Sequence, residues 1–112
     1  MNPDEAREAF RLSCENPELA YEILTLGVVK VREWLKGFEE AVTERDFLKL
    51  FPLFPLEKKE AEIYLQILAL KTGREEKVNP QHLLALNKAL EQVQMQASPR
   101  LVVEGLALKL FA

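Results

Sequence analysis

The chain has 112 residues, which is the length of one ordinary domain, and 48% of them are hydrophobic while 29% are charged. This balance allows a buried core under a solvated surface and argues against a disordered chain. The net charge of -3 gives no broad positive field that would attract phosphates, so the composition does not favour direct nucleic-acid binding.

The first third of the sequence predicts three helices. Asn2-Pro3 and Asn16-Pro17 are each followed by acidic residues, which is typical of helix starts, and the break between these two helices is expected near Cys14-Glu15. After Gly27, apolar residues recur at the three-and-four spacing of an amphipathic helix. Ala6, Phe10 and Ser13 are expected to share one face of the first helix, and the buried side of the second is expected to carry Leu19, Ile23 and Leu24. The apolar face of the third consists of Val28, Val31, Trp34, Leu35, Phe38 and Val42.

Gly37 and the segment 47–55 each allow more than one interpretation. Gly37 lies inside the helix, where it indicates either a close approach by another helix or simple tolerance of glycine. The segment 47–55 contains three phenylalanines and two prolines, which predicts a short helix followed by a bend. Its phenylalanines are expected in the core, with an exposed anchor for a partner as the alternative.

Three further helices are predicted downstream. One runs from Leu56 to about Thr72-Gly73, and a charged loop, 74–78, follows it. Asn79-Pro80 and Ser98-Pro99 start the last two helices. Their expected apolar faces are Ala61, Tyr64, Leu65, Leu68 and Ala69, then Leu83, Leu84, Leu86, Leu90 and Val93, and then Leu101, Val102, Leu106, Leu108 and Leu110. No alternating pattern competes, so we predict an all-α protein, a compact bundle of about five to seven helices.

The residue types that carry chemistry do not form a recognisable catalytic or metal-binding set. Cys14 is the only cysteine and His82 the only histidine, so neither a disulfide nor a zinc or iron ligand cluster is expected, and no cofactor is expected either. Cys14 as a nucleophile remains the alternative to an ordinary thiol. The sequence contains no phosphate-binding glycine loop. We therefore expect a protein that is not an enzyme.

No uncharged apolar run is long enough to span a membrane, and the acidic start is unlike a secretion signal, so a cytoplasmic protein without membrane contact is expected. The helix expected after Gly27 offers Lys30, Arg32 and Lys36 as a small cationic face, but neighbouring glutamates dilute its field. Direct binding to DNA is therefore a weaker alternative to binding other proteins.

The segment 98–110 resembles the final helix of bacterial clamp-loader subunits of DNA polymerase III, which ends in the pattern [N/S]-P-[R/Q]-L-x-x-E-x-L-x-L-[K/R]-L. The segment 11–20 looks like the lid segment that in delta-prime subunits reads roughly L-S-G-G-N-P-G-x-A. Here Cys14 and Glu15 stand in place of the paired glycines, and Glu18 stands near the position where ATP-binding relatives have a nucleotide-sensing arginine. The match is most like delta-prime, with gamma/tau second.

The resemblance implies that residues 1–26 are the end of an AAA+ lid-like helical segment and that residues 27–112 are a helical, collar-like oligomerisation domain. It implies a non-catalytic assembly domain that supports DNA replication, with other clamp-loader subunits as partners. Self-association of the isolated domain is also left open. The expected subunit contact comprises Ser98, Arg100, Glu104, Leu108 and Lys109. The alternative is an unrelated helical adaptor that binds a peptide or partner helix through the segment Phe47 to Phe54.

Overall fold

The computed structural model describes residues 3–46, 48–49, 53, 57–74, 79–95 and 97–111, without the side chains of Leu108 and Phe111. Within these residues the regular structure consists of six α-helices and no strands, which confirms the all-α bundle predicted from the sequence. In chain order they are α1 (Pro3–Leu12), α2 (Pro17–Leu26), α3 (Val28–Glu44), α4 (Lys58–Gly73), α5 (Pro80–Gln94) and α6 (Pro99–Phe111).

The helix starts follow the Asn-Pro and Ser-Pro pairs. The Asn16 side chain accepts a hydrogen bond from the Leu19 N–H at 3.2 Å, and the Asn79 side chain accepts from Gln81 and His82 at 3.0 and 3.2 Å. Each asparagine thereby satisfies backbone donors that have no partner within the helix. Proline follows in the first turn, where its missing N–H costs nothing, so these starts are confirmed.

The predicted break between α1 and α2 is a left-handed turn at Cys14 and Glu15, whose φ angles are 56° and 67°. The Phe10 carbonyl accepts a hydrogen bond from the Glu15 N–H at 2.9 Å and another from the buried Ser13 hydroxyl at 2.8 Å. These bonds close the end of α1 and send the chain back as α2. Both turn residues have a backbone conformation that glycine adopts at lower cost.

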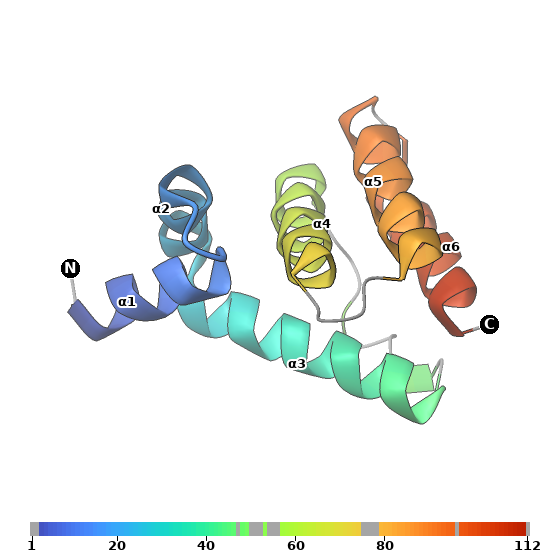
Figure 1. Cartoon of the computed structure of the whole chain (residues 1–112), viewed down its shortest axis with the longest axis horizontal. Helices are drawn as coiled ribbons and strands as arrows, with labels where there is room; N and C mark the ends of the chain where they lie inside the picture. Colours follow the sequence, from blue (N-terminus) through green and yellow to red (C-terminus); the bar gives the residue numbers. More distant parts are fainter. Residues whose placement is uncertain are drawn as a thin grey trace.

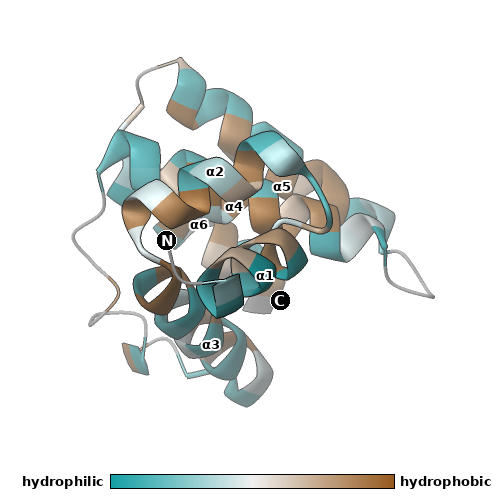
Figure 2. Ribbon diagram, turned by 90° about the vertical axis from the view of Figure 1, so that its left-hand side faces the viewer, coloured by the Kyte–Doolittle hydropathy of each residue, from teal (hydrophilic) through white to brown (hydrophobic). Residues whose placement is uncertain are grey.

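Helix α4 lies in the middle of the molecule, between the α1–α2 pair and the α5–α6 pair, and α3 runs beneath all of them (Figure 1). In Figure 2 apolar segments occur on α2, α4 and α5 where these helices lie together, whereas much of the visible surface of α1 and α3 is hydrophilic. The sequence predicted one buried stripe on α4, but the helix is buried on several sides: Ala61, Ile63, Tyr64, Leu65, Ile67 and Leu68. Such burial is expected of a central helix.

Stacked aromatic rings join α3 to α4. The ring of Trp34 lies between those of Phe38 and Tyr64, with centroid distances of 5.0 and 4.2 Å and nearly parallel planes. All three side chains are buried, as predicted. The Trp34 indole N–H and the Tyr64 hydroxyl are buried without a hydrogen-bond partner in the described part of the chain. Burial, with a smaller contribution from Glu60, raises the pKa of Tyr64 to about 12.

Three residues of the predicted helix faces lie at the surface. Phe10, Leu84 and Leu101 are exposed, the last two with about two thirds of their surface free. In each helix a smaller residue is buried instead: Ala9 in α1, Ala89 in α5 and Ala107 in α6. Small side chains allow helices to approach closely, so packing rotates each helix slightly and moves the larger neighbour to the surface.

A side chain, and not the backbone of another helix, approaches Gly37. A Cβ atom at Gly37 would lie 3.1 Å from Cδ2 of Leu53, which is tighter than ordinary contact. Leu48 and Lys49 form a short 3₁₀ turn before this point, in agreement with the short helix expected there. Phe47, Phe51 and Phe54, and most of the predicted loop 74–78, lie outside the described residues.

Candidate protein interaction surface

The predicted contact residues lie on α6 and at its start. The Ser98 hydroxyl faces the Leu101 N–H at 3.5 Å, and the Ser98 carbonyl accepts from the Val102 N–H at 3.0 Å, so Ser98 caps the helix. Arg100 Nε donates to Glu104 Oε1 at 3.1 Å, one helical turn away. This pair is partly exposed, and exposed pairs of this kind contribute only about 0.5 kcal/mol. The pair therefore contributes little to the stability of the fold.

The five predicted residues do not form one cluster. Lys109 is nine positions after Arg100, which places it roughly 180° around the helix. Arg100 and Glu104 lie on one flank of the exposed face of α6, Lys109 lies on the other, and the exposed Leu101 separates them. The Leu108 side chain lies outside what the structure describes. The sequence motif thus spans the exposed face instead of marking a single spot on it.

Two adjoining hollows run along the outer side of α5 and α6, and we call them together the α5–α6 groove. The first has a volume of about 230 Å³ and is bounded by Ala85, Lys88, Ala89, Gly105 and Lys109 among others. The second, of about 470 Å³, is bounded by Gln92, Met95, Ala97, Ser98, Leu101 and Val102. Gln92, Leu101 and Val102 line both hollows, so the groove is continuous.

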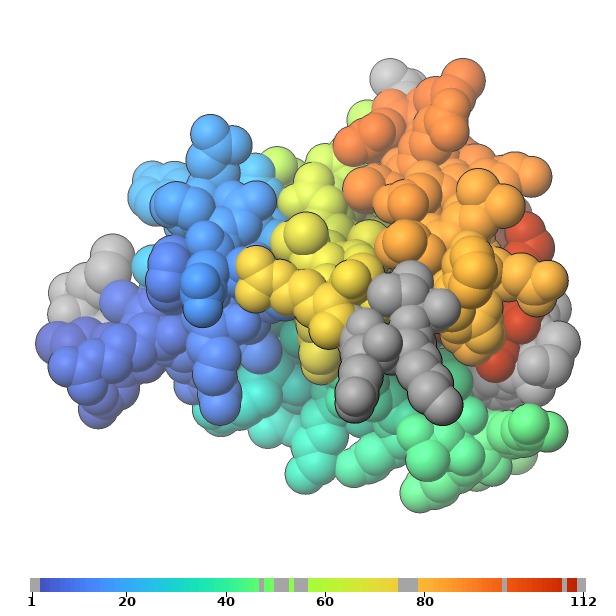
Figure 3. All heavy atoms as spheres, in the orientation of Figure 1, coloured from blue at the N-terminus to red at the C-terminus, as the bar shows by residue number. Residues whose placement is uncertain are grey.

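Exposed apolar side chains accompany this groove. Met95, which caps the end of α5, and Leu101 both line it and are 75% and 67% exposed, while Leu84 of α5, outside its lining, is 69% exposed. In Figure 3 the α5–α6 pair forms one end of the molecule. Large apolar side chains gathered beside a groove are typical of protein-interaction sites. This surface is therefore the best candidate for binding another protein.

Sequence reasoning named the α6 side of this surface and missed the α5 side. The apolar residues of α5 were assigned to a single buried face, although Leu83, Leu84 and Leu86 cannot all point the same way in a helix. Three leucines within four residues therefore indicated that at least one of them is exposed. The burial of Ala89 could not be read from the sequence, because alanine occurs equally on both sides of helices.

Another hollow, of about 380 Å³, lies where α3, α4, α5 and α6 meet, and His82 contributes to its wall. Lys71 of α4 donates a hydrogen bond to Glu39 of α3 at the same place. Residues 75–78 lie outside the description of this region.

Cys14 is a free thiol in the left-handed turn. Among the described residues no group of three or more His, Cys, Asp or Glu side chains could hold a metal ion.

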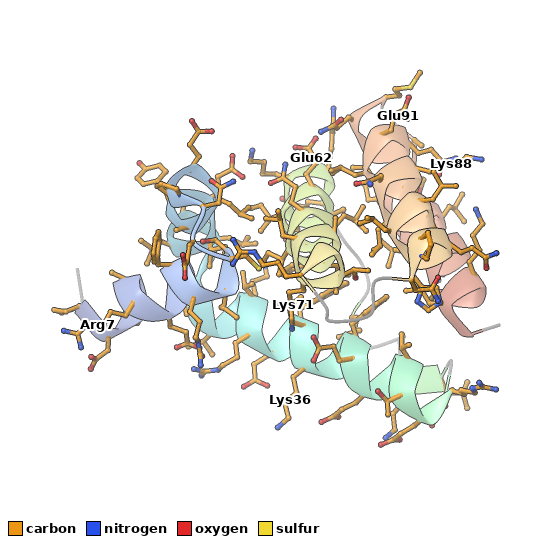
Figure 4. All side chains as sticks on the ribbon, viewed as in Figure 1. Arg7, Lys36, Glu62, Lys71, Lys88 and Glu91 are labelled. Atoms are coloured by element: carbon orange, nitrogen blue, oxygen red, sulfur yellow. The ribbon has the colours of Figure 1, made fainter. Side chains whose placement is uncertain are left out.

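The cationic face of α3 is partly engaged within the molecule. Lys30 Nζ lies 3.0 Å from Glu60 Oε1, and Arg32 Nη1 lies 2.9 Å from Glu8 Oε1. Figure 4 shows Lys36 pointing away from the remainder of the molecule. Two of the three cations thus have carboxylate partners, which further weakens the field that this face would offer a phosphate. In the part of the chain that the structure describes, no helix is both long and apolar enough to cross a membrane.

Comparison with protein-family models, curated proteins and solved structures found no match to this chain.

Proposed function

We propose that this chain is a non-catalytic assembly domain of a bacterial clamp loader of DNA polymerase III, most like delta-prime and next most like gamma/tau. In this proposal the domain binds other clamp-loader subunits, supports DNA replication in the cytoplasm, and contacts neither DNA nor membrane directly. The α5–α6 groove and the exposed face of α6, with Ser98, Arg100, Glu104 and Lys109, form the subunit contact.

The observation that carries the assembly role is the α5–α6 groove. It places Met95 and Leu101, both largely exposed, on a helix pair that ends with the clamp-loader-like segment. Full burial of a side chain of this size is worth about 1.5–3 kcal/mol, so two such residues supply a useful part of a binding free energy. A helical face of this kind needs no catalytic residue in order to act.

The turn at Cys14 and Glu15 supports the choice of family. The lid pattern of delta-prime has paired glycines at these two positions, and both residues of this chain have the positive φ that favours glycine. Asn16 and Pro17, which continue the pattern, cap and start α2. The division into residues 1–26 and 27–112 falls at Gly27, between α2 and α3, and stays a prediction. Buried residues on both sides of it belong to one core.

The proposal is tested by retention of clamp-loader subunits from the same source on the immobilised chain, followed by sizing of the retained complex. Stoichiometric retention is expected. Leu101→Asp should weaken retention at least tenfold, because a carboxylate would then have to be desolvated inside the contact. Val29→Asp is the matched control, since Val29 is an exposed apolar residue of α3, far from the groove in sequence.

Arg100→Ala and Glu104→Ala should also weaken retention while leaving the melting temperature within a few degrees of the parent value. The proposal fails if the folded chain retains no clamp-loader subunit, or if Leu101→Asp and Val29→Asp reduce retention equally. Failure would leave the adaptor hypothesis with its Phe47–Phe54 segment as the account to pursue.

A further inference from the structure

Charge is distributed unequally between the two ends of the molecule. Residues 3–26, which form α1 and α2, contain six carboxylates and two arginines. Residues 80–111, which form α5 and α6, contain three cations and two carboxylates. The α1–α2 pair and the α5–α6 pair lie at opposite ends, with α4 between them (Figures 1 and 3). The molecule therefore has an acidic end and a weakly basic end.

The α5–α6 groove carries the positive charge of the basic end. Lys88 of α5 and Lys109 of α6 both line it, and its described lining contains no carboxylate. Neither lysine forms an ion pair within the described residues. Figure 4 shows Lys88 on the outer side of α5, directed away from α4. An occupant of this groove with negative charge and an apolar side chain would satisfy both parts of its lining.

Helix α2 presents such a combination at the acidic end. Glu18, Tyr21, Glu22 and Thr25 follow the three-and-four spacing of one helix face, and Tyr21 is 70% exposed. Glu18 is exposed and has no ion-pair partner among the described residues, while Glu22 accepts a hydrogen bond from Lys59 at 3.0 Å. Glu18 and Glu22 are four residues apart, which is about 6 Å along the helix, and both lie on the same flank of Tyr21. We call these four residues the α2 ridge.

We propose that the α5–α6 groove of one copy of this chain binds the α2 ridge of a second copy. Tyr21 packs against the exposed Leu101 and Met95, while Glu18 and Glu22 approach Lys88 and Lys109. The two surfaces are different and lie at opposite ends, so the contact is heterologous and each added copy leaves one groove and one ridge free. Association consequently continues beyond a dimer, into a closed ring or an open chain.

This association involves only copies of this chain, whatever other subunits the groove also accepts, and it does not depend on the proposed function. One helix in one groove buries an area at the low end of the range for specific interfaces, so the association is weak. Salt weakens it further, because it screens the attraction between the charged residues.

Sedimentation velocity of the full chain over a range of concentrations measures this association directly. We expect the average mass to rise with concentration, past that of a dimer, and the rise to shrink at about 0.5 M salt, where charges are screened within about 5 Å. A chain that stays monomeric at the highest concentrations overturns the proposal. So does a species that stops at a dimer.

Charge reversal identifies the two surfaces. The groove variant Lys88→Glu with Lys109→Glu and the ridge variant Glu18→Lys with Glu22→Lys should each associate at least tenfold more weakly than the parent chain. A one-to-one mixture of the two variants should associate again, because reversed grooves now face reversed ridges. Undiminished association of either variant, or no recovery in the mixture, overturns the proposal.

Circular dichroism first checks that each variant folds, since Glu22→Lys also removes the ion pair with Lys59. Should the ridge variant unfold, Tyr21→Ala replaces it and must weaken association in the same way. The outcome is separable from that of the proposed function: retention of clamp-loader subunits by a monomeric chain would overturn only this inference, and self-association without retention would overturn only the former.

Discussion

Replacing Glu15 by glycine should make the protein more stable, which is the opposite of the usual effect of a glycine substitution. Glu15 is exposed and has a φ of 67°, in the left-handed region. This conformation costs a residue with a side chain about 1–2 kcal/mol. Glycine avoids that cost but gives the unfolded chain additional freedom worth about 0.4–1 kcal/mol. The expected net gain is about 0.5–1 kcal/mol, or several degrees in melting temperature for a chain of this size.

Glu33→Gly is the matched control, because it removes the same side chain from an exposed position in the right-handed interior of α3. It should lose about 1 kcal/mol. Urea unfolding followed by circular dichroism gives both free energies of unfolding. The value for Glu15→Gly should lie above that of the parent and the value for Glu33→Gly below it, so that the two variants differ by about 1.5–2 kcal/mol. If Glu15→Gly is destabilised as much as Glu33→Gly, the left-handed turn does not exist in solution, and its support for the family resemblance is lost.

Three further changes probe the fold. Asn79→Ala should lose about 1 kcal/mol of stability in urea unfolding because it removes the cap of α5, whereas Asn87→Ala, within the same helix, should be neutral or slightly stabilising. Tyr64→Phe should be no less stable than the parent at pH 7, since the lost hydroxyl is buried without a hydrogen bond; an appreciably less stable variant would show that the hydroxyl has a partner. Burial raises the pKa of Tyr64 from 10.0 to about 12 in the folded chain, so the unfolded chain loses this proton at a lower pH. The free energy of unfolding is therefore unaffected by Tyr64 below pH 10 and falls as the pH rises towards 12. The melting temperature should accordingly fall more steeply above pH 10 in the parent than in Tyr64→Phe. Gly37→Ala should gain stability in a Leu53→Ala background, where the 3.1 Å contact is removed, and gain less or lose in the parent; equal effects in both backgrounds would refute the close contact.

The sequence was sufficient to predict the starts of α2 and α5, because local chemistry sets them. Asn16 and Asn79 cap their own helices through bonds to residues two or three positions away, and proline then fixes the first turn. The buried face of α3 was equally readable, since its large apolar residues recur at one spacing. The rotation of α1, α5 and α6 was misjudged, and so was the burial of α4 on more than one side. Rotation depends on which small residue meets a neighbouring helix, and that neighbour is distant in the sequence.

The candidate site was only partly predictable for the same reason. Arg100 and Glu104 were correctly expected beside each other on α6, because their spacing of four residues is one helical turn. The groove itself requires two helices, and its second wall, which includes Lys88, Gln92 and Met95, depends on how α5 is rotated against α6. The phenylalanine segment that supports the adaptor alternative remains a prediction.

The stacked rings of Trp34, Phe38 and Tyr64 give the molecule an intrinsic optical probe. Trp34 is the only tryptophan in the chain, and it lies between α3 and α4 with its face covered by Tyr64. Its fluorescence therefore reports the separation of these two helices and is insensitive to fraying of α6, whereas circular dichroism reports all helices equally. Unfolding curves from the two signals would coincide if the bundle opens as one cooperative unit. A tryptophan transition that lags behind the loss of helix would show that the α5–α6 end opens first, while the central helix is still docked.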